Sequence, residues 1–304
     1  MGVLNRALAR LPKPLQSSVK RTGRLLRDKV YAKQGTVEMK LGRFTLEIPK
    51  HHHLMALLKS QPYRNLCVGI AAKQVSLKHN DATIVDIGAN IGDTAAVIAQ
   101  HCANKLILVE ASDYFAGILA RNVKQFPNEV EIQRVFVSDG KEIRGNLHYR
   151  GGTAFFEEGA GASSGPSKPT RRLCDIADAK TRFVKIDTDG FDTKIIRAGL
   201  DWLAAQKPAL LFENTIADKE TLDDADSLFE NLKEIGYEYF IYWDDPGFHV
   251  LSTTSLAATK DLNRYLFKLV ESGYPRGISN YDVLCLQAGD EDIFEQVTRY
   301  YREL

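Results

Sequence analysis

One short segment carries the strongest chemical signal in the sequence. Residues 86–93 read DIGANIGD and directly follow a short apolar run. Gly88 and Gly92 would let the backbone turn tightly and approach a ligand closely, where a Cβ atom would clash. In folds built from strand–helix units, ligands bind beyond the carboxyl ends of the strands. The segment therefore predicts a ligand-binding turn.

The polar residues of this turn indicate which ligand fits. A dinucleotide-binding turn would need glycines at positions 88, 90 and 93, but Asn90 and Asp93 occupy two of these positions. An acidic residue at the start of the following helix disfavours a pyrophosphate. It suits a ligand that carries an ammonium and a sulfonium group. The turn therefore favours S-adenosylmethionine over NAD as the cofactor.

Two more strand ends carry residues suited to the same cofactor. Glu110 ends the apolar run 105–110, where a carboxylate can accept hydrogen bonds from both ribose hydroxyls. Ser138 and Asp139 end the run 131–139, from which they would reach the adenine edge. Either carboxylate alone could be a loop residue or a helix cap. Acidic ends on three strands beside a glycine turn are a stronger signal than any one of them.

Carboxylates at the ends of two later runs could act on a methyl acceptor. Asp187 and Asp189 follow one run and Glu213 follows the next. A hydroxyl is a weak nucleophile, so a general base assists its methylation. These three residues could supply that base and orient the hydroxyl, or they could hold Mg²⁺. Alternatively, Asp187 contacts only the cofactor and Asp189 caps a helix. His148 and His249 are other candidate bases, although a surface position is expected for both.

The elements that must position these residues alternate between short apolar runs and helical patterns. This alternation predicts an α/β fold with a mostly parallel sheet of seven strands and helices on both faces. The predicted strands are 83–88, 105–110, 131–139, 182–187, 209–214, 237–243 and 281–287, with an edge strand at 145–150 and helices at 93–101, 112–126, 191–198 and 222–235.

The residues before this sheet form a separate prelude. Apolar and polar residues alternate over 36–48 around Gly42, which predicts a hairpin, and a helix is expected over 63–77. The three histidines at 51–53 are expected in a solvated loop, since no second group of metal ligands is near in sequence. The predicted units are a basic arm (1–35), a hairpin and helix (36–80) and the cofactor-binding domain (81–304).

The charge of the chain is unevenly distributed. Residues 1–30 hold eight basic residues and one acidic residue, so this arm carries +7, and the remaining chain carries −6 because the whole carries +1. An acidic body argues against a nucleic-acid partner. Four leucines between positions 4 and 15 recur on one helix face. The arm is therefore either a peripheral anchor on anionic lipid or an extension that is flexible or packed against a partner.

Other features place the protein among cytoplasmic proteins. The four cysteines are scattered without a CxxC pair, so neither a zinc site nor a disulfide framework is expected. No run approaches the ~20 apolar residues of a membrane span. We therefore expect a cytoplasmic protein, with contact at the inner membrane surface as the consequence of the anchor interpretation.

Several motifs taken together resemble one enzyme family. VDIGANIGD, LVEAS, FVKIDTDGFD and a strand that ends in FEN are similar to the FkbM family of class I, Rossmann-like methyltransferases, over residues 36–290. The resemblance implies an S-adenosylmethionine-dependent O-methyltransferase that acts on a hydroxyl of a sugar, glycan or related natural product. It implies that the cofactor lies at Asp86–Gly92, Glu110 and the Ser138–Asp139 turn.

Two other functions remain open at this point. A methyltransferase that acts on protein or nucleic acid is one, although the Asn-Pro-Pro-Tyr type of motif is replaced by residues 186–189, IDTD. An inactive scaffold that only binds partners is the other, and the intact glycine turn with Glu110 speaks against it. Aromatic and acidic residues at 242–248 would suit a carbohydrate surface, but core packing would give the same pattern.

Overall fold

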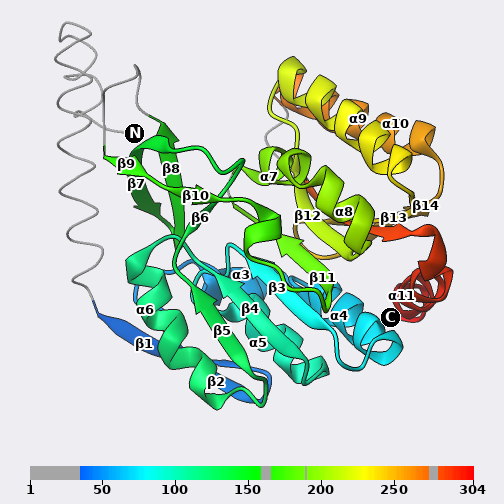
Figure 1. Ribbon diagram of the computed structural model, residues 1–304. Coiled ribbons are helices and arrows are strands. Elements are labelled where there is room, and N and C mark those ends of the chain that lie inside the picture. The colour runs from blue at the N-terminus through cyan, green and yellow to red at the C-terminus, as the bar shows by residue number, and fades with distance from the viewer. Residues whose placement is uncertain (1–34, 159–165, 189, 274–279) are drawn as a thin grey trace, which may run out of the picture.

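A twisted sheet of eight strands forms the centre of the molecule (Figure 1). The computed structural model describes residues 35–158, 166–188, 190–273 and 280–304. The predicted basic arm, apart from Gly35, therefore lies outside the described residues. None of the described helices is long and apolar enough to cross a membrane.

The order of the strands places a switch point at the middle of the sheet. β3 has parallel neighbours on both sides, and the chain runs outward from it in one direction and then returns to build the other half. β15 runs antiparallel between β12 and β13. The spatial order is β14 (His249–Thr253), β13 (Tyr237–Asp244), β15 (Asn280–Gln287), β12 (Ala209–Thr215), β11 (Thr181–Ile186), β3 (Thr83–Ile87), β4 (Lys105–Val109) and β5 (Val130–Gln133).

Helices cover both faces of this sheet, each over its own hydrophobic core. One face packs against α4 (Leu66–Lys78), α5 (Asp93–His101), α6 (Asp113–Asn122) and α11 (Glu291–Glu303). The other packs against α7 (Asp192–Ala198), α8 (Leu200–Gln206), α9 (Lys219–Glu234) and α10 (Leu256–Glu271). Since the strands are apolar on both sides, only this double cover buries them. The predicted α/β class, with a mostly parallel sheet between two layers of helices, is confirmed.

The predicted hairpin is also confirmed. β1 (Thr36–Leu41) pairs with β2 (Phe44–Pro49), and the alternating apolar side chains join the same core as α4, α5 and α6. The Asn122 side chain at the end of α6 accepts from the Glu47 backbone N–H (2.7 Å) and donates to its carbonyl (2.9 Å). The helix expected over 63–77 is α4, which begins at Leu66, and a further helix that was not predicted, α3 (Leu54–Ser60), precedes it.

Three strand predictions were wrong in detail. The sheet has eight strands and not seven, because β14 adds an edge strand that was not predicted. The run 131–139 divides into β5 and β6 (Phe136–Val137), because the chain leaves the sheet edge and β6 pairs with β10 (Thr170–Arg171). The run 145–150 is not an edge strand of the main sheet. It belongs to β7 (Ile143–Arg150), which pairs with β8 (Thr153–Glu158) and β9 (Ser167–Lys168) in a separate sheet.

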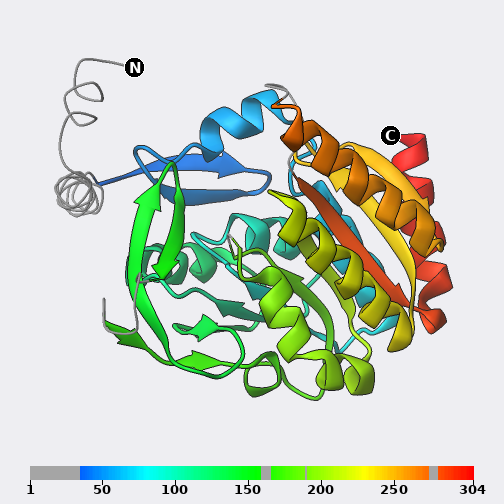
Figure 2. The ribbon, with the colours of Figure 1, turned by 90° about the horizontal axis from the view of Figure 1, so that it is seen from above.

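The β1–β2 hairpin and the β7–β8–β9 sheet lie on the side of the molecule opposite α11 (Figure 2). The turn between β7 and β8 reaches back to the segment that precedes α3, because the His53 backbone N–H donates to the Gly151 carbonyl at 2.8 Å. The β7–β8 turn and the segment before α3 thereby lie at the end of the central sheet where the carboxyl termini of β3, β4 and β11 meet.

Candidate functional site

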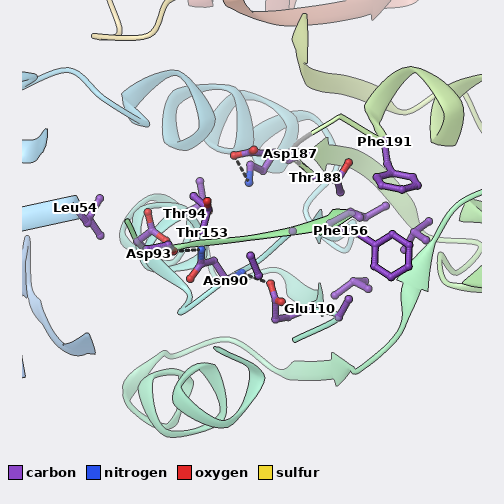
Figure 3. Close-up of a pocket in the computed structure, with 18 of the residues that line it drawn as sticks. Leu54, Asn90, Asp93, Thr94, Glu110, Thr153, Phe156, Asp187, Thr188 and Phe191 are labelled. Carbon is purple, nitrogen blue, oxygen red and sulfur yellow. Dashed lines mark hydrogen bonds and ion pairs between the residues drawn. The ribbon is translucent and has the colours of Figure 1, made fainter. Parts of the chain in front are cut away.

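A pocket opens at the carboxyl ends of β3, β4 and β11, next to the switch point of the sheet. Figure 3 shows Phe156 and Phe191 at one end of it, Leu54 at the other, and Glu110 and Asn90 between them. Its walls come from the β3–α5 turn, the end of β4, the β7–β8 hairpin, α3 and the start of α4. Segments far apart in the sequence therefore meet around one cavity.

The glycine turn has the left-handed backbone that its sequence predicts. Gly88 has φ +82°, Gly92 has φ +88°, and Asn90 between them has φ +49°. A Cβ on Gly88 would lie 1.8 Å from the Asp187 carbonyl oxygen, and one on Gly92 would lie 2.7 Å from the Leu119 side chain. The close approach is therefore to the end of β11 and to α6. This corrects the expectation that both glycines make room for a ligand.

Glu110 is held at the centre of the pocket wall. Its side chain is buried, and it accepts from the Asn90 backbone N–H at 2.9 Å and from the Ser112 backbone N–H at 2.7 Å. Burial raises the pKa of Glu110 to about 7, against the effect of these two hydrogen bonds. Each carboxylate oxygen keeps a further lone pair, so Glu110 can still accept from a ligand.

Asn90 ties this turn to the small β7–β8–β9 sheet. Its Nδ2 donates to the Gly152 carbonyl at 2.8 Å, while its Oδ1 is buried without a partner among the described residues. His52 lies against the same hairpin and lines the pocket. The expectation of a solvated loop is right for His51, which is exposed, but wrong for His52. The segment is a turn and not an extended strand, since the His52 backbone N–H donates to the Pro49 carbonyl at 2.9 Å.

A buried lysine neutralises two of the predicted acidic residues. Lys185 stands beside Asp86 in the register of β11 and β3, with 3.1 Å between its Nζ and Asp86 Oδ1. The same Nζ lies 3.3 Å from Asp187 Oδ2. Burial opposes the charge of Lys185, but the two carboxylates raise its pKa above the usual value. Asp86 is wholly buried and supports the pocket from beneath, whereas Asp187 lines it.

Further carboxylates lie behind Asp187. Burial raises the pKa of Glu213 to about 8, with added repulsion from Asp187, Asp192 and Asp282. Asp282 faces Glu213 directly across the β12–β15 pair, and burial raises its pKa to about 7. Asp192, whose pKa burial raises to about 6, accepts from the Thr188 backbone N–H and hydroxyl at 3.1 and 2.7 Å. Asp187 and Glu213 were predicted as site residues from the sequence, whereas Asp192 and Asp282 were not.

The remaining predicted site residues do not all line the pocket. Asp93 begins α5, lines the pocket and accepts from Asn65 Nδ2 at 3.2 Å. Ser138 is buried, and Asp139 lies 3.8 Å from Lys141, but neither lines the pocket. The preceding residues 135–137 line it instead. Asp189 lies outside the described residues.

The alternative bases do not line the pocket. His148 is buried, contrary to the expected surface position, and its Nε2 lies 3.2 Å from Glu157. His249 shares a 2.8 Å hydrogen bond with Ser252. Trp243, from the stretch considered for carbohydrate binding, is buried in the core. Among the described residues, no group of three or more His, Cys, Asp or Glu side chains is arranged to hold a metal ion.

Aromatic side chains close one end of the pocket. The rings of Phe156 and Phe191 meet edge to face at 6.2 Å, and those of Phe136 and Phe156 at 5.2 Å. All three line the pocket together with Val135 and Val137. This end can take a flat apolar group, while the middle of the pocket is polar and acidic and Leu54 lies beyond it.

No protein-family model matches the sequence, and no curated protein matches it. The chain is distantly similar to several solved structures. One is the precorrin-6y C5,15-methyltransferase from Geobacter metallireducens GS-15, at 14% identity and a TM-score of 0.36, over 72% of this chain and 87% of that one. Another is an rRNA methylase from Streptococcus thermophilus, at 8% identity and a TM-score of 0.39, over 71% and 93% of the two chains.

A third is methyltransferase FkbM from Methylobacillus flagellatus KT, at 13% identity and a TM-score of 0.35. The alignment covers 67% of this chain but 44% of that one, so this chain spans less than half of its length. Similarity at this level leaves the function to be inferred from the site itself.

Proposed function

We propose that the protein is an S-adenosylmethionine-dependent methyltransferase that transfers a methyl group to a hydroxyl of a sugar, glycan or related small molecule. The observation that carries the proposal is the joint position of Glu110 and the left-handed Asn90 turn at the switch point, inside an acidic pocket. A carboxylate held there between backbone donors is suited to two neighbouring hydroxyls of a ribose.

The charge of the pocket favours a cationic cofactor. Its lining holds the carboxylates of Asp93, Glu110 and Asp187 against the cations Arg64 and Lys185. Asp86 beneath Lys185 adds one more negative charge. The net charge of these six side chains is therefore negative when all of them are ionised. A pyrophosphate would meet this negative field and the Asp93 side chain at the start of α5, whereas an ammonium and a sulfonium would be attracted to it.

The layout of the pocket also matches the parts of this cofactor. The aromatic end formed by Phe136, Phe156 and Phe191 would take the adenine, and Glu110 would accept from the ribose. The polar end near Asn90 and Asp93 would take the amino-acid part. When bound, S-adenosylmethionine supplies an electrophilic methyl group.

Asp187 is the residue that we assign to the acceptor. It lines the pocket, its side chain is 48% exposed, and Lys185 holds one of its oxygens. The other oxygen is available to orient a hydroxyl and to accept its proton. Glu213 stands behind it with a pKa of about 8, so it is mostly protonated at neutral pH and adds little negative charge to repel the Asp187 carboxylate. Asp189, which lies outside the described residues, stays a predicted member of this set.

A methyl-transfer assay with a panel of sugar and natural-product hydroxyls tests this assignment. Asp187→Asn should lower turnover by about 10²–10⁴-fold while cofactor affinity stays near that of the wild type. Asp201→Asn, at an exposed position of α8, is the matched control and should leave turnover unchanged. Near-normal turnover by Asp187→Asn would show that the acceptor is activated elsewhere.

A further inference from the structure

His52 presents an unused hydrogen-bond donor to the pocket. Its Nδ1 accepts from the Leu54 backbone N–H at 3.1 Å. In a neutral imidazole one ring nitrogen accepts and the other carries the proton, so the proton is on Nε2. Burial lowers the pKa of His52, with partial compensation from Asp93, and this keeps the ring neutral at physiological pH. Nε2 makes no well-formed hydrogen bond among the described residues, although the Asn90 side chain and the Gly152 backbone lie near the ring.

The position of the ring is fixed by its surroundings. It meets Phe115 edge to face at 6.3 Å, and a Cβ on Gly152 would lie 2.6 Å from its Nδ1. Phe115 is itself wholly buried in α6. The donor therefore cannot turn to solvent without displacing the β7–β8 turn. A buried donor without a partner is costly, and such a group in a pocket wall indicates a ligand that completes it.

An unused acceptor lies beside this donor. Asn90 neighbours His52, and its amide donates to the Gly152 carbonyl, which leaves Oδ1 without a partner among the described residues. Asp93, which also lines the pocket, places a carboxylate near the same ring. This part of the wall thus offers a neutral N–H donor next to an amide oxygen and a carboxylate. The complementary group carries a carboxylate and an ammonium on neighbouring atoms.

We propose that His52, from the segment between β2 and α3, is a positioning residue that holds the α-carboxylate of the methionine part of the cofactor, while Asn90 and Asp93 hold its ammonium. This inference rests on the proposed function. It adds a residue outside the glycine turn to the cofactor site. Bound cofactor would supply the hydrogen-bond partner that the His52 Nε2–H lacks beside the β7–β8 turn.

Calorimetry with two ligands tests the proposal. S-adenosylhomocysteine carries the amino-acid end, and 5′-methylthioadenosine has the same adenosine and sulfur without it. His52→Ala should weaken the first ligand by about 10- to 150-fold, the range expected for one hydrogen bond to a charged group. It should leave the second unchanged. His52→Gln, which restores an N–H donor, should recover most of the lost affinity.

Controls separate this role from a structural one. His51→Ala, at the exposed neighbouring position, should bind both ligands like the wild type. Equal weakening of both ligands by His52→Ala, or no weakening of either, would overturn the His52 assignment alone. Failure of the wild-type protein to bind either ligand would overturn the proposed function and this inference with it.

Discussion

At the scale of single residues, the site depends on charges that the fold buries in pairs. The acidic ends of the first two strands were predictable, because a carboxylate beside a glycine turn is a local pattern. The role of Lys185 was not predictable, because it depends on the pairing of β11 with β3, which places Lys185 beside Asp86. The same holds for Asp282, which meets Glu213 only because β15 inserts antiparallel beside β12.

Substitution of Lys185 should lower the free energy of unfolding, because it leaves the Asp86 carboxylate buried and unpaired beneath the pocket. Lys185→Met leaves Asp86, which is wholly buried, without its cation, and this should lower the free energy of unfolding by about 3–5 kcal/mol. Urea unfolding measures the change. Lys180→Met removes an ion pair with Asp81 that is mostly exposed, and it should leave the free energy of unfolding close to that of the wild type. Equal losses in the two variants would contradict the role of the buried pair.

At the scale of elements, the sequence predicted the sheet and its helices better than the small sheets around the pocket. The β3–α5, β4–α6 and β11–α7 units follow from apolar runs between helical patterns, which are local signals. The β7–β8–β9 sheet and the departure of β6 from the sheet edge depend on pairing between distant segments. The pocket wall that they contribute, and the inward His52, could not be inferred without that pairing.

The β3–α5 turn is the element most sensitive to a single methyl group. Gly88→Ala would place its Cβ 1.8 Å from the Asp187 carbonyl oxygen at a φ of +82°. We expect a loss of more than about 2 kcal/mol in unfolding free energy, since the left-handed backbone alone costs about 1–2 kcal/mol in a residue with a Cβ. Chemical unfolding of purified variants gives the value.

The matched control lies in a helix of the same core. Gly117 sits within α6 with nothing within 4 Å of an added Cβ, so Gly117→Ala should stabilise the protein by about 0.5–1 kcal/mol. A stable Gly88→Ala protein would show that the turn can move away from β11, and would remove the steric reason for glycine at this position.

At the scale of the whole molecule, one end of the sheet concentrates carboxylates that burial keeps partly protonated. The fold class and the switch point follow from the order of elements in the sequence, whereas this electrostatic character depends on burial, which the sequence does not state. Glu110, Asp282 and Glu213 have pKa values of about 7, 7 and 8, all above those of an unfolded chain. Such groups link stability to pH.

The sign of this linkage is fixed by the raised pKa values. A folded-state pKa above the unfolded one stabilises the protein fully below the unfolded pKa, and the stabilisation is lost as pH rises through the folded value. Between pH 7 and pH 9 we therefore expect the melting temperature to fall, by about 2–4 °C for each kcal/mol lost. Buried Cys67 and Cys285, whose pKa burial also raises, act in the same direction.

Variants identify the groups responsible for this slope. Glu213→Gln should reduce the fall in melting temperature between pH 7 and pH 9, because its pKa of about 8 lies within this window. Glu291→Gln, at an exposed position of α11, should leave the slope as in the wild type. A wild-type slope in Glu213→Gln would contradict the burial of a protonated carboxyl at the end of β12.

Direct calorimetry of cofactor binding tests the central claim, that this acidic switch-point pocket holds S-adenosylmethionine through Glu110. Wild-type protein should bind S-adenosylhomocysteine with a dissociation constant in the micromolar range, bind no NAD, and lose roughly 1–3 kcal/mol of binding free energy in Glu110→Ala, whose missing carboxylate no longer accepts from the ribose. Absence of heat with S-adenosylhomocysteine at about 1 mM, or binding of NAD in its place, would contradict the claim.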